Sequence, residues 1–283
     1  MTPEDVDVTT TPQIYGASEL GVLSITAPGS AHPRVEYVGG EIFVGLAEDG
    51  VVVTQGQADA MTRPFAAAVV DSLPTVSSLP DSDDGVVLIQ DEALAAGILI
   101  EPERIAEVAL AGDPVVFALS RSAVVIVGAD DEAGIVRVLD IAEALFDEGG
   151  PLVSAHPVVL IDGAWRPFRW KERFAQLGLR IERVLRLFSV RAYEAQSAAL
   201  ARPDVHLADP KIHVREDGVT LTFAAWPKGT ATLLPVVDNV MIADPAGSVS
   251  VATMQEFLSA AGDAVVRTGL SPMRYFVPGA APR

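Results

Sequence analysis

The sequence contains no cysteine, and this absence excludes several kinds of chemistry. Without thiols the chain cannot form disulfides, thiolate metal sites or iron–sulfur clusters, and it has no cysteine nucleophile. Lysine and asparagine are scarce as well: the lysines are Lys171, Lys211 and Lys228, and Asn239 is the single asparagine. GC-rich coding DNA or, in part, adaptation to high salt produces such a pattern, and neither explanation bears on activity.

Long hydrophobic runs are also missing. No apolar stretch approaches the ~20 residues that span a bilayer. The first residues, "MTPEDVDVTTTPQ", are acidic and polar, whereas a secretory signal is basic and then apolar. We therefore expect a cytoplasmic protein without a membrane partner. Hydrophobic residues make up 49% of the 283-residue chain, enough for the core of one large or two ordinary domains.

The common nucleotide and hydrolase motifs do not occur. The sequence has no Gly-x-x-x-x-Gly-Lys loop, no Gly-x-Gly-x-x-Gly after a strand and no Gly-x-Ser-x-Gly elbow. These absences leave an enzyme open but remove the usual cofactor-dependent classes. We expect no cofactor, and we favour a protein that is not an enzyme.

Positive charge is in short supply, since the formal net charge is −18 at pH 7. Such a charge repels nucleic acid and anionic membranes at long range. It makes general affinity of the whole molecule for DNA or anionic lipid unfavourable.

Three segments follow one pattern, a hairpin and then a helix. Asp-Gly turns indicate two of the hairpins, because glycine accepts a positive φ angle. The pattern predicts the following elements: strands 42–46 and 51–54 with a helix over 58–73; strands 115–119 and 123–127 with a helix over 132–146; and a hairpin turning at 217–218, a strand over 237–243 and a helix near 251–266.

The second and third segments are loosely similar to each other. "AVVIVGADD" matches "NVMIADPAG", and each precedes an amphipathic stretch, which indicates an internal repeat of pattern. Carboxylates at such a joint stabilise the start of a helix, so we interpret Asp130 and Asp131 as capping residues. The alternative is a magnesium site, if Asp130, Asp131, Asp238 and Asp244 converge.

The mixture of strands and helices with several hairpins predicts an α+β fold with largely antiparallel sheets. We expect an N-terminal α+β lobe over 1–164, a basic amphipathic connecting helix over 165–191 and a C-terminal α+β lobe over 192–283.

The segment 165–191, "WRPFRWKERFAQLGLRIERVLRLFSVR", is unusually basic. It holds eight basic residues against Glu172 and Glu182, a local charge of +6 that leaves −24 for the rest of the chain. Apolar residues recur at helical spacing, and tryptophans alternate with arginines at its start. The residues predicted to form a binding patch are Trp165, Arg166, Arg169, Trp170, Arg173, Arg180 and Arg183.

Three interpretations of this segment remain open. The arginines can face the acidic lobes of their own chain while the aromatic residues fill the core. They can instead bind the carboxylates of an acidic protein partner. Arginine beside exposed aromatic rings is also typical of single-stranded nucleic-acid binding, although the overall charge disfavours it.

A second cluster, in "PDVHLADPKIHV", contains Asp204, His206, Asp209 and His213. Imidazoles and carboxylates are ligands for zinc, iron or manganese, so the cluster raises the hypothesis of a metal-dependent hydrolase. The spacing matches no established ligand motif, and a solvated loop followed by a polar strand face explains the same residues.

The sequence therefore predicts a non-catalytic interaction or assembly protein, which binds an acidic protein partner or associates with itself. Hairpin-rich lobes offer strand edges for such association. The alternatives are a metal-dependent hydrolase that uses the His/Asp cluster and a single-stranded nucleic-acid binder that uses the Trp/Arg segment.

Overall fold

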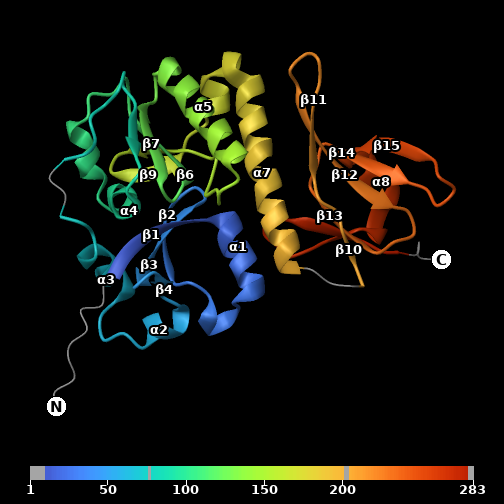
Figure 1. The fold of residues 1–283 in the computed structure, drawn as a ribbon, viewed down its shortest axis with the longest axis horizontal. Helices are drawn as coiled ribbons and strands as arrows, with labels where there is room; N and C mark the ends of the chain where they lie inside the picture. The colour runs from blue at the N-terminus through green and yellow to red at the C-terminus, as the bar shows by residue number, and fades with distance from the viewer. Residues whose placement is uncertain (1–9, 76–77, 201–203, 280–283) are drawn as a thin grey trace. The chain divides into compact units, whose positions relative to one another are not determined.

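The computed structural model describes residues 10–75, 78–200 and 204–279. The chain divides into two compact units, Met1–Arg173 and Phe174–Arg283, and each is described by itself below. Helices and mostly antiparallel strands alternate through both units, so the predicted α+β class is confirmed (Figure 1).

The first unit contains two antiparallel sheets. In sheet 1 the strand order is β1-β3-β2, and β4 also pairs with β3. In sheet 2 the order is β5-β7-β6-β8-β9. The strands are β1 (Thr10–Gly16), β2 (Val35–Gly39), β3 (Ile42–Glu48), β4 (Val51–Val52), β5 (Val87–Ile89), β6 (Pro114–Ser120), β7 (Ala123–Gly128), β8 (Val158–Ile161) and β9 (Ala164–Pro167).

The two sheets share one topology in their first parts. In sheet 1 a strand, a helix and a hairpin follow one another as β1, α1 (Ala17–Thr26), β2 and β3, and the last strand pairs with both others. In sheet 2 the same order recurs as β5, α4 (Glu92–Ile100), β6 and β7. The first unit thus contains two strand–helix–hairpin motifs with the same strand order.

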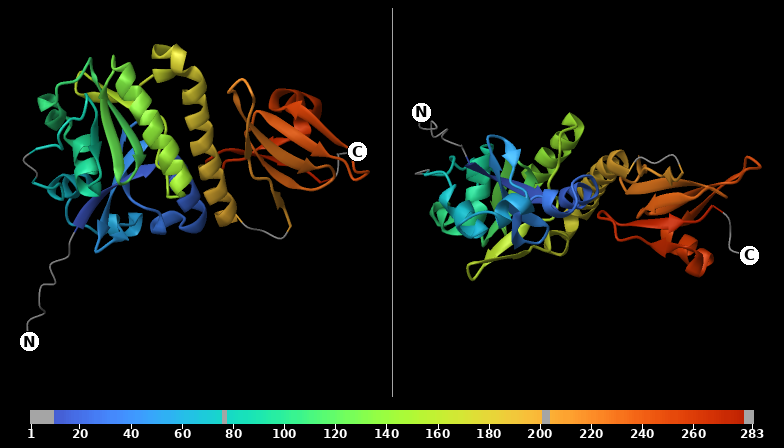
Figure 2. Two further views of the ribbon diagram at one scale, coloured as in Figure 1. Left: turned by 45° about the horizontal axis from the view of Figure 1, so that its top comes forward. Right: turned by 90° about the horizontal axis from the view of Figure 1, so that it is seen from below.

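The core of the first unit lies around α4. Every residue from Leu94 to Leu99 is buried, and this helix packs against β1 on one side and against β5 and β7 on the other. Both faces of β6 and β7 are buried, because α5 (Glu132–Glu148) covers the face turned away from α4. Figure 2 shows α5 lying along sheet 2.

The helix predicted over 58–73 is two short helices instead, α2 (Gln55–Asp59) and α3 (Phe65–Asp71). Pro64 is the cause, because a proline has no N–H to donate and its ring blocks a continuous helix. It takes an extended conformation with ψ 138° immediately before α3. The 3-10 helices of this unit are η1 (Gly29–Ala31) and η2 (Pro102–Glu107).

The segment predicted as one connecting helix over 165–191 is wrong in its first part. It begins in β9, passes through α6 (Trp170–Arg173) and η3 (Ala175–Leu177), and becomes a long helix only at α7 (Gly178–Leu200). Pro167 and the tight hairpin between β8 and β9 keep its start extended. The boundary between the two units lies inside this segment.

The second unit contains two four-stranded sheets. Sheet 3 has the order β10-β13-β17-β16 and sheet 4 has the order β11-β12-β14-β15, with parallel pairs β10·β13 and β12·β14. The strands are β10 (His206–Leu207), β11 (Lys211–Val214), β12 (Thr220–Pro227), β13 (Thr232–Pro235), β14 (Asn239–Ala243), β15 (Val249–Thr253), β16 (Val266–Arg267) and β17 (Arg274–Val277).

The helix predicted near 251–266 starts later than expected. Its first part is strand β15, and the helix α8 runs only from Met254 to Ala261, before η4 (Gly262–Ala264). Thr253 begins it through a capping box with Glu256. The loose match with the segment after Val127 therefore ends at the strand, because α5 follows β7 directly whereas a further strand separates β14 from α8.

Candidate functional site

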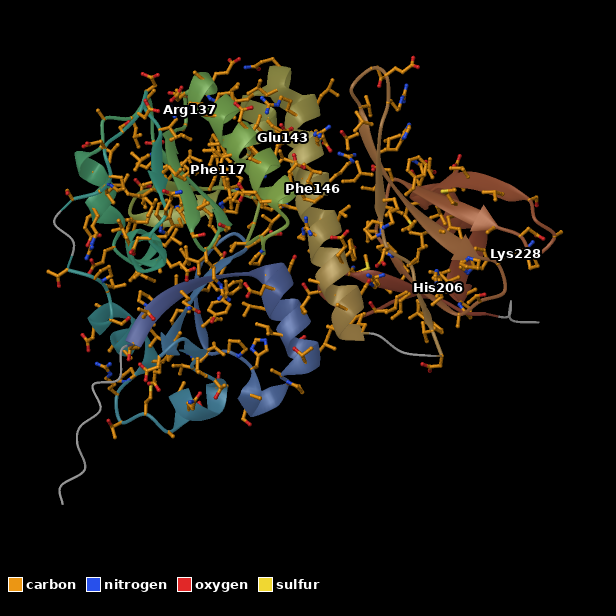
Figure 3. All side chains as sticks on the ribbon, in the orientation of Figure 1. Phe117, Arg137, Glu143, Phe146, His206 and Lys228 are labelled. Atoms are coloured by element: carbon orange, nitrogen blue, oxygen red, sulfur yellow. The ribbon has the colours of Figure 1, made fainter. Side chains whose placement is uncertain are left out.

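The tryptophans of the predicted patch belong to the core of the first unit. Trp170 is 3% exposed and meets the ring of Phe117 edge-on, with centroids 5.0 Å apart (Phe117 is labelled in Figure 3). Trp165 packs against the core, and its indole N–H donates to the carbonyl of Leu99, 2.8 Å away, at the end of α4. Neither ring is free to stack on a base, which removes the main support for nucleic-acid binding.

The arginines of this segment in the first unit lie on its surface. Arg166 is exposed on β9, and Arg169 is exposed with Glu172 at 3.3 Å. Arg173 forms an ion pair with Asp130. Exposed pairs of this kind contribute roughly 0–1 kcal/mol to stability. Only Arg166 and Arg169 keep the exposed character that the acidic-partner hypothesis requires.

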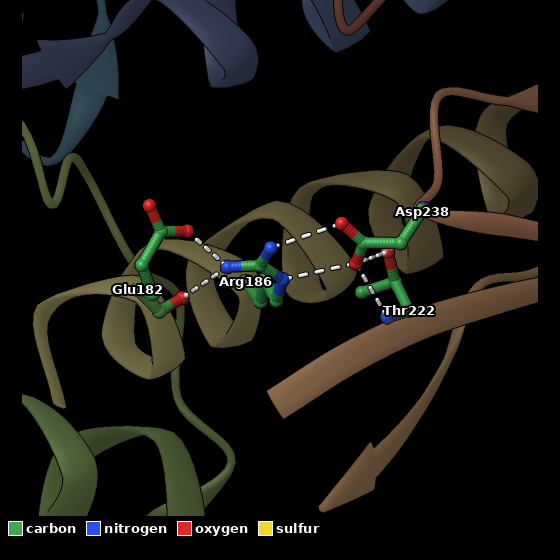
Figure 4. A network of polar contacts seen from close by, with 4 residues as sticks. All are labelled: Glu182, Arg186, Thr222 and Asp238. Atoms are coloured by element: carbon green, nitrogen blue, oxygen red, sulfur yellow. Dashed lines mark hydrogen bonds and ion pairs between the residues drawn. The ribbon is translucent and has the colours of Figure 1, made fainter. Parts of the chain in front are cut away.

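On α7 the arginines are already engaged within the chain. Arg180 and Arg183 are partly buried, and each interacts with other groups of the protein. Arg186 donates two hydrogen bonds to Asp238, at 3.0 and 2.9 Å, and also binds Glu182 (Figure 4). Asp238 in turn accepts from the backbone N–H and the hydroxyl of Thr222, at 2.7 and 2.8 Å. This network attaches α7 to sheet 4.

A second arginine, which the sequence pattern did not single out, anchors α7 to sheet 3. Arg274 is 0% exposed, and all its contacts are with neutral groups, among them the side chains of Gln196 and Ser197 and the carbonyls of Ala208 and Leu233. Burial lowers the pKa of Arg274, while Tyr193 and Asp209 act in the opposite direction. Every donor is used internally, so this cation holds the unit together and is not a ligand site.

The four residues of the His/Asp cluster are not brought together. Asp204 and His206 are exposed, the latter on β10 of sheet 3 (Figure 3), whereas His213 is exposed on β11 of sheet 4. Asp209 accepts a hydrogen bond from Ser197. Within the described residues, no three or more histidines, aspartates or glutamates are placed to hold a metal ion.

The four aspartates of the other predicted metal site have separate structural partners. Asp131 accepts from the backbone N–H of Gly134 at 2.9 Å, so it is the N-cap of α5 as interpreted above. Asp130 and Asp238 bind arginines, and Asp244 binds Lys228 at 3.2 Å. "AVVIVGADD" is thus the start of a helix in this structure.

A polar cluster in the first unit was also missed from the sequence. Arg121 lies over the ring of Tyr15, 4.7 Å from its centroid, and pairs with Glu19 at 2.6 Å. Burial raises the pKa of Glu19, and Arg121 opposes this effect. The cluster joins α1 to the turn between β6 and β7, residues far apart in the sequence, so local patterns could not reveal it.

One large apolar surface stands out, the outer face of sheet 4. We define it by the strand positions that point away from the core of the second unit. The inward positions Ala224 and Val240 pack with Phe257 of α8, and Figure 2 shows α8 and sheet 3 on one side of sheet 4. The outer face consists of Lys211, His213, Leu221, Phe223, Ala225, Pro227, Asn239, Met241, Ala243, Val249, Val251 and Thr253.

The outer face is exposed and contains no carboxylate. Met241 is 38% exposed, Val251 57% and Val249 60%, and these three lie on neighbouring positions of β14 and β15. A soluble surface rarely leaves such a contiguous apolar area uncovered unless it binds another molecule. Its freedom from acidic residues is notable in a chain with 38 of them.

No protein-family model, no curated protein and no solved structure matches the chain. In the described residues, no helix has the length and apolar character needed to cross a membrane.

Proposed function

We propose that the protein is a non-catalytic interaction protein, which binds another protein molecule through the outer face of sheet 4. The observation that carries this proposal is the exposed, apolar and carboxylate-free strip around Met241, Val249 and Val251. A protein partner buries such a strip favourably, at about 25 cal/mol for each Å² of apolar surface removed from water. The arginine-rich segment has a smaller part than its composition indicated, because most of its arginines have partners within the chain.

The geometry of sheet 4 supports a binding role for this face. The apolar side chains lie on β12, β14 and β15, which are bonded to one another over several residues and therefore form a rigid surface. A preformed surface loses little conformational entropy on binding. Lys211 and His213 on β11 border it and add the only charged or titratable groups.

Site-specific photocrosslinking tests this proposal in cells that produce the protein. A photoreactive phenylalanine analogue replaces Met241 in one variant and Val70 in a control; Val70 is 48% exposed on α3 of the first unit. We expect position 241 to form a defined crosslinked product, either with another protein or with a second copy, and position 70 to form none.

Adding Val251→Asp to the crosslinking variant supplies the specificity control. A carboxylate at the centre of the apolar strip is desolvated on binding, so the product should decrease by at least about tenfold. A position 241 that crosslinks no more than position 70, or a product that is indifferent to Val251→Asp, contradicts the proposal.

A further inference from the structure

The strand β15 forms an open edge of sheet 4. It pairs with β14 on one side only, and in the described part of the chain it has no second strand neighbour. Proteins usually protect such an edge with lysine, proline, a bulge or a covering element. The residues of β15, Val-Ser-Val-Ala-Thr, include neither charge nor proline, and their register with β14 is regular.

The hydrogen-bond alternation shows which backbone groups of β15 face this edge. The N–H of Met254 donates to Asp238 at 3.0 Å, and the N–H of Asp244 donates to Ser248 at 2.8 Å. In an antiparallel pair every second residue is bonded to its partner, so Ser250 and Ala252 bond to β14. Val249, Val251 and Thr253 therefore turn their N–H and C=O groups outward.

Thr253 is already committed to α8. Its N–H donates to the carboxylate of Glu256 at 2.8 Å, and as the N-cap residue its carbonyl begins the helix. The edge thus offers the N–H and C=O groups of Val249 and Val251, and one register of a second β15 strand satisfies all of them. In that antiparallel register Val249 faces Val251 of the second copy, and each such pair exchanges two hydrogen bonds.

We propose that two copies of this chain associate through β15, in antiparallel fashion, with the twofold axis at Ser250. The two sheets then continue into one another across the axis. Ser250 faces Ser250 of the second copy in a pair without hydrogen bonds, where the Cα atoms are about 4.5 Å apart and small side chains are favoured. This inference rests on the proposed function, because it names the partner of the same sheet.

Charge and side-chain pattern agree with a second copy as the occupant. Two chains of net charge −18 repel one another, and an interface between them must avoid acidic groups. Both β15 and the outer face meet this requirement. Across the axis the apolar row Ala225, Met241 and Val251 is continued by Val249, Ala243 and Pro227 of the second copy.

Cysteine crosslinking provides a sharp test, because the natural chain has no cysteine. Ser250→Cys places two thiols across the axis at a Cα separation of about 4.5 Å, within the range of a disulfide. Ser259→Cys on the exposed side of α8 is the control. Under mild oxidation the Ser250→Cys dimer should form at least about tenfold faster than the control dimer, since association raises the effective thiol concentration to about the millimolar range.

A backbone variant tests the hydrogen bonds themselves. Val251→Pro removes an outward N–H and leaves the bonds to β14 in place, which sheets tolerate at an edge. Val251→Thr keeps the N–H and the branched shape. At about 100 μM, where dimers with a Kd near or below that value are populated, wild type and Val251→Thr should sediment as dimers and Val251→Pro as a monomer with unchanged circular dichroism.

The outcomes separate this inference from the proposed function. A wild type that stays monomeric while position 241 crosslinks to another protein overturns the dimer and leaves the proposed function standing. A dimer that survives Val251→Pro but is lost in Met241→Asp also overturns the edge pairing, because the copies then meet face to face. A Ser250→Cys variant that crosslinks no faster than Ser259→Cys overturns it as well. A monomer that forms no crosslink from position 241 overturns both.

Discussion

At the scale of the residue, Asp238 shows how the acidic chain uses its arginines. Its carboxylate binds the guanidinium of Arg186 with both oxygens and also accepts two hydrogen bonds from Thr222 (Figure 4). Burial raises the pKa of Asp238, but the hydrogen bonds and the charge of Arg186 outweigh burial and hold the pKa below its ordinary value. The folded chain therefore binds this proton less tightly than the unfolded chain does.

This difference predicts a pH dependence of stability. A carboxyl group with a lowered folded-state pKa contributes fully above its ordinary pKa of 3.8, and its contribution disappears as the pH falls through the folded-state value. Between about pH 5 and pH 2 the free energy of unfolding of the wild type should fall more steeply than that of Asp238→Asn. Urea unfolding followed by circular dichroism measures both curves.

The control for this prediction is Asp217→Asn, which removes an exposed carboxylate from the turn between β11 and β12 without disturbing Arg186. Parallel curves for the wild type and Asp238→Asn would show that the network does not depend on the ionised form of Asp238.

At the scale of the element, the start of α5 shows how a local pattern can resemble a site. The apolar strand β7 ends at Gly128, and a carboxylate pair follows, as at many catalytic corners. In the structure Asp131 accepts the N–H of Gly134, and Asp130 binds Arg173. Both carboxylates have structural partners.

The capping role predicts a modest and specific loss of stability. Asp131→Ala leaves the N–H of Gly134 without its acceptor and should lower the free energy of unfolding by about 1 kcal/mol. Asp131→Ser retains a capping oxygen and should stay within about 0.5 kcal/mol of the wild type. Equilibrium denaturation of the three proteins measures this, and equal effects of the two substitutions would argue against capping.

At the scale of the whole molecule, charge and hydrophobic surface act in opposite directions. The net charge of −18 keeps copies apart at a distance, whereas the outer face of sheet 4 and the edge of β15 favour association on contact. Salt distinguishes the two effects, because it screens exposed charges and leaves apolar contacts in place. The Debye length falls from about 30 Å at 0.01 M to about 8 Å at 0.15 M ionic strength.

Self-association should therefore strengthen several-fold as salt rises over this range, in sedimentation experiments at fixed protein concentration. The Val251→Pro variant controls for salt-induced aggregation and should remain monomeric at both ends. Association that weakens with salt would indicate the other predicted mode, in which exposed arginines such as Arg166 and Arg169 bind acidic groups.

The features that the sequence predicted correctly depend on neighbours in the chain. The Asp49-Gly50 pair turns β3 into β4 with φ angles of 49° and 80°, and such turns favour these residues whatever the rest of the fold. The long helix after Asp131 follows from its apolar periodicity. The helix expected near 251–266 was wrong in its first part because Val249–Thr253 suits a strand once β14 is present to pair with it.

The sequence by itself determined the α+β class, the hairpin turns, the absence of thiol chemistry and the excess of acid, because each depends on composition or on adjacent residues. Only the tertiary structure decided the fate of the side chains that had suggested a function. Trp170 lies against Phe117, Arg186 against Asp238, and His206 and His213 on different sheets. Partners far apart in the chain made these choices, and sheet pairing likewise left the edge of β15 open. Contacts of that kind leave no periodic signal in a sequence.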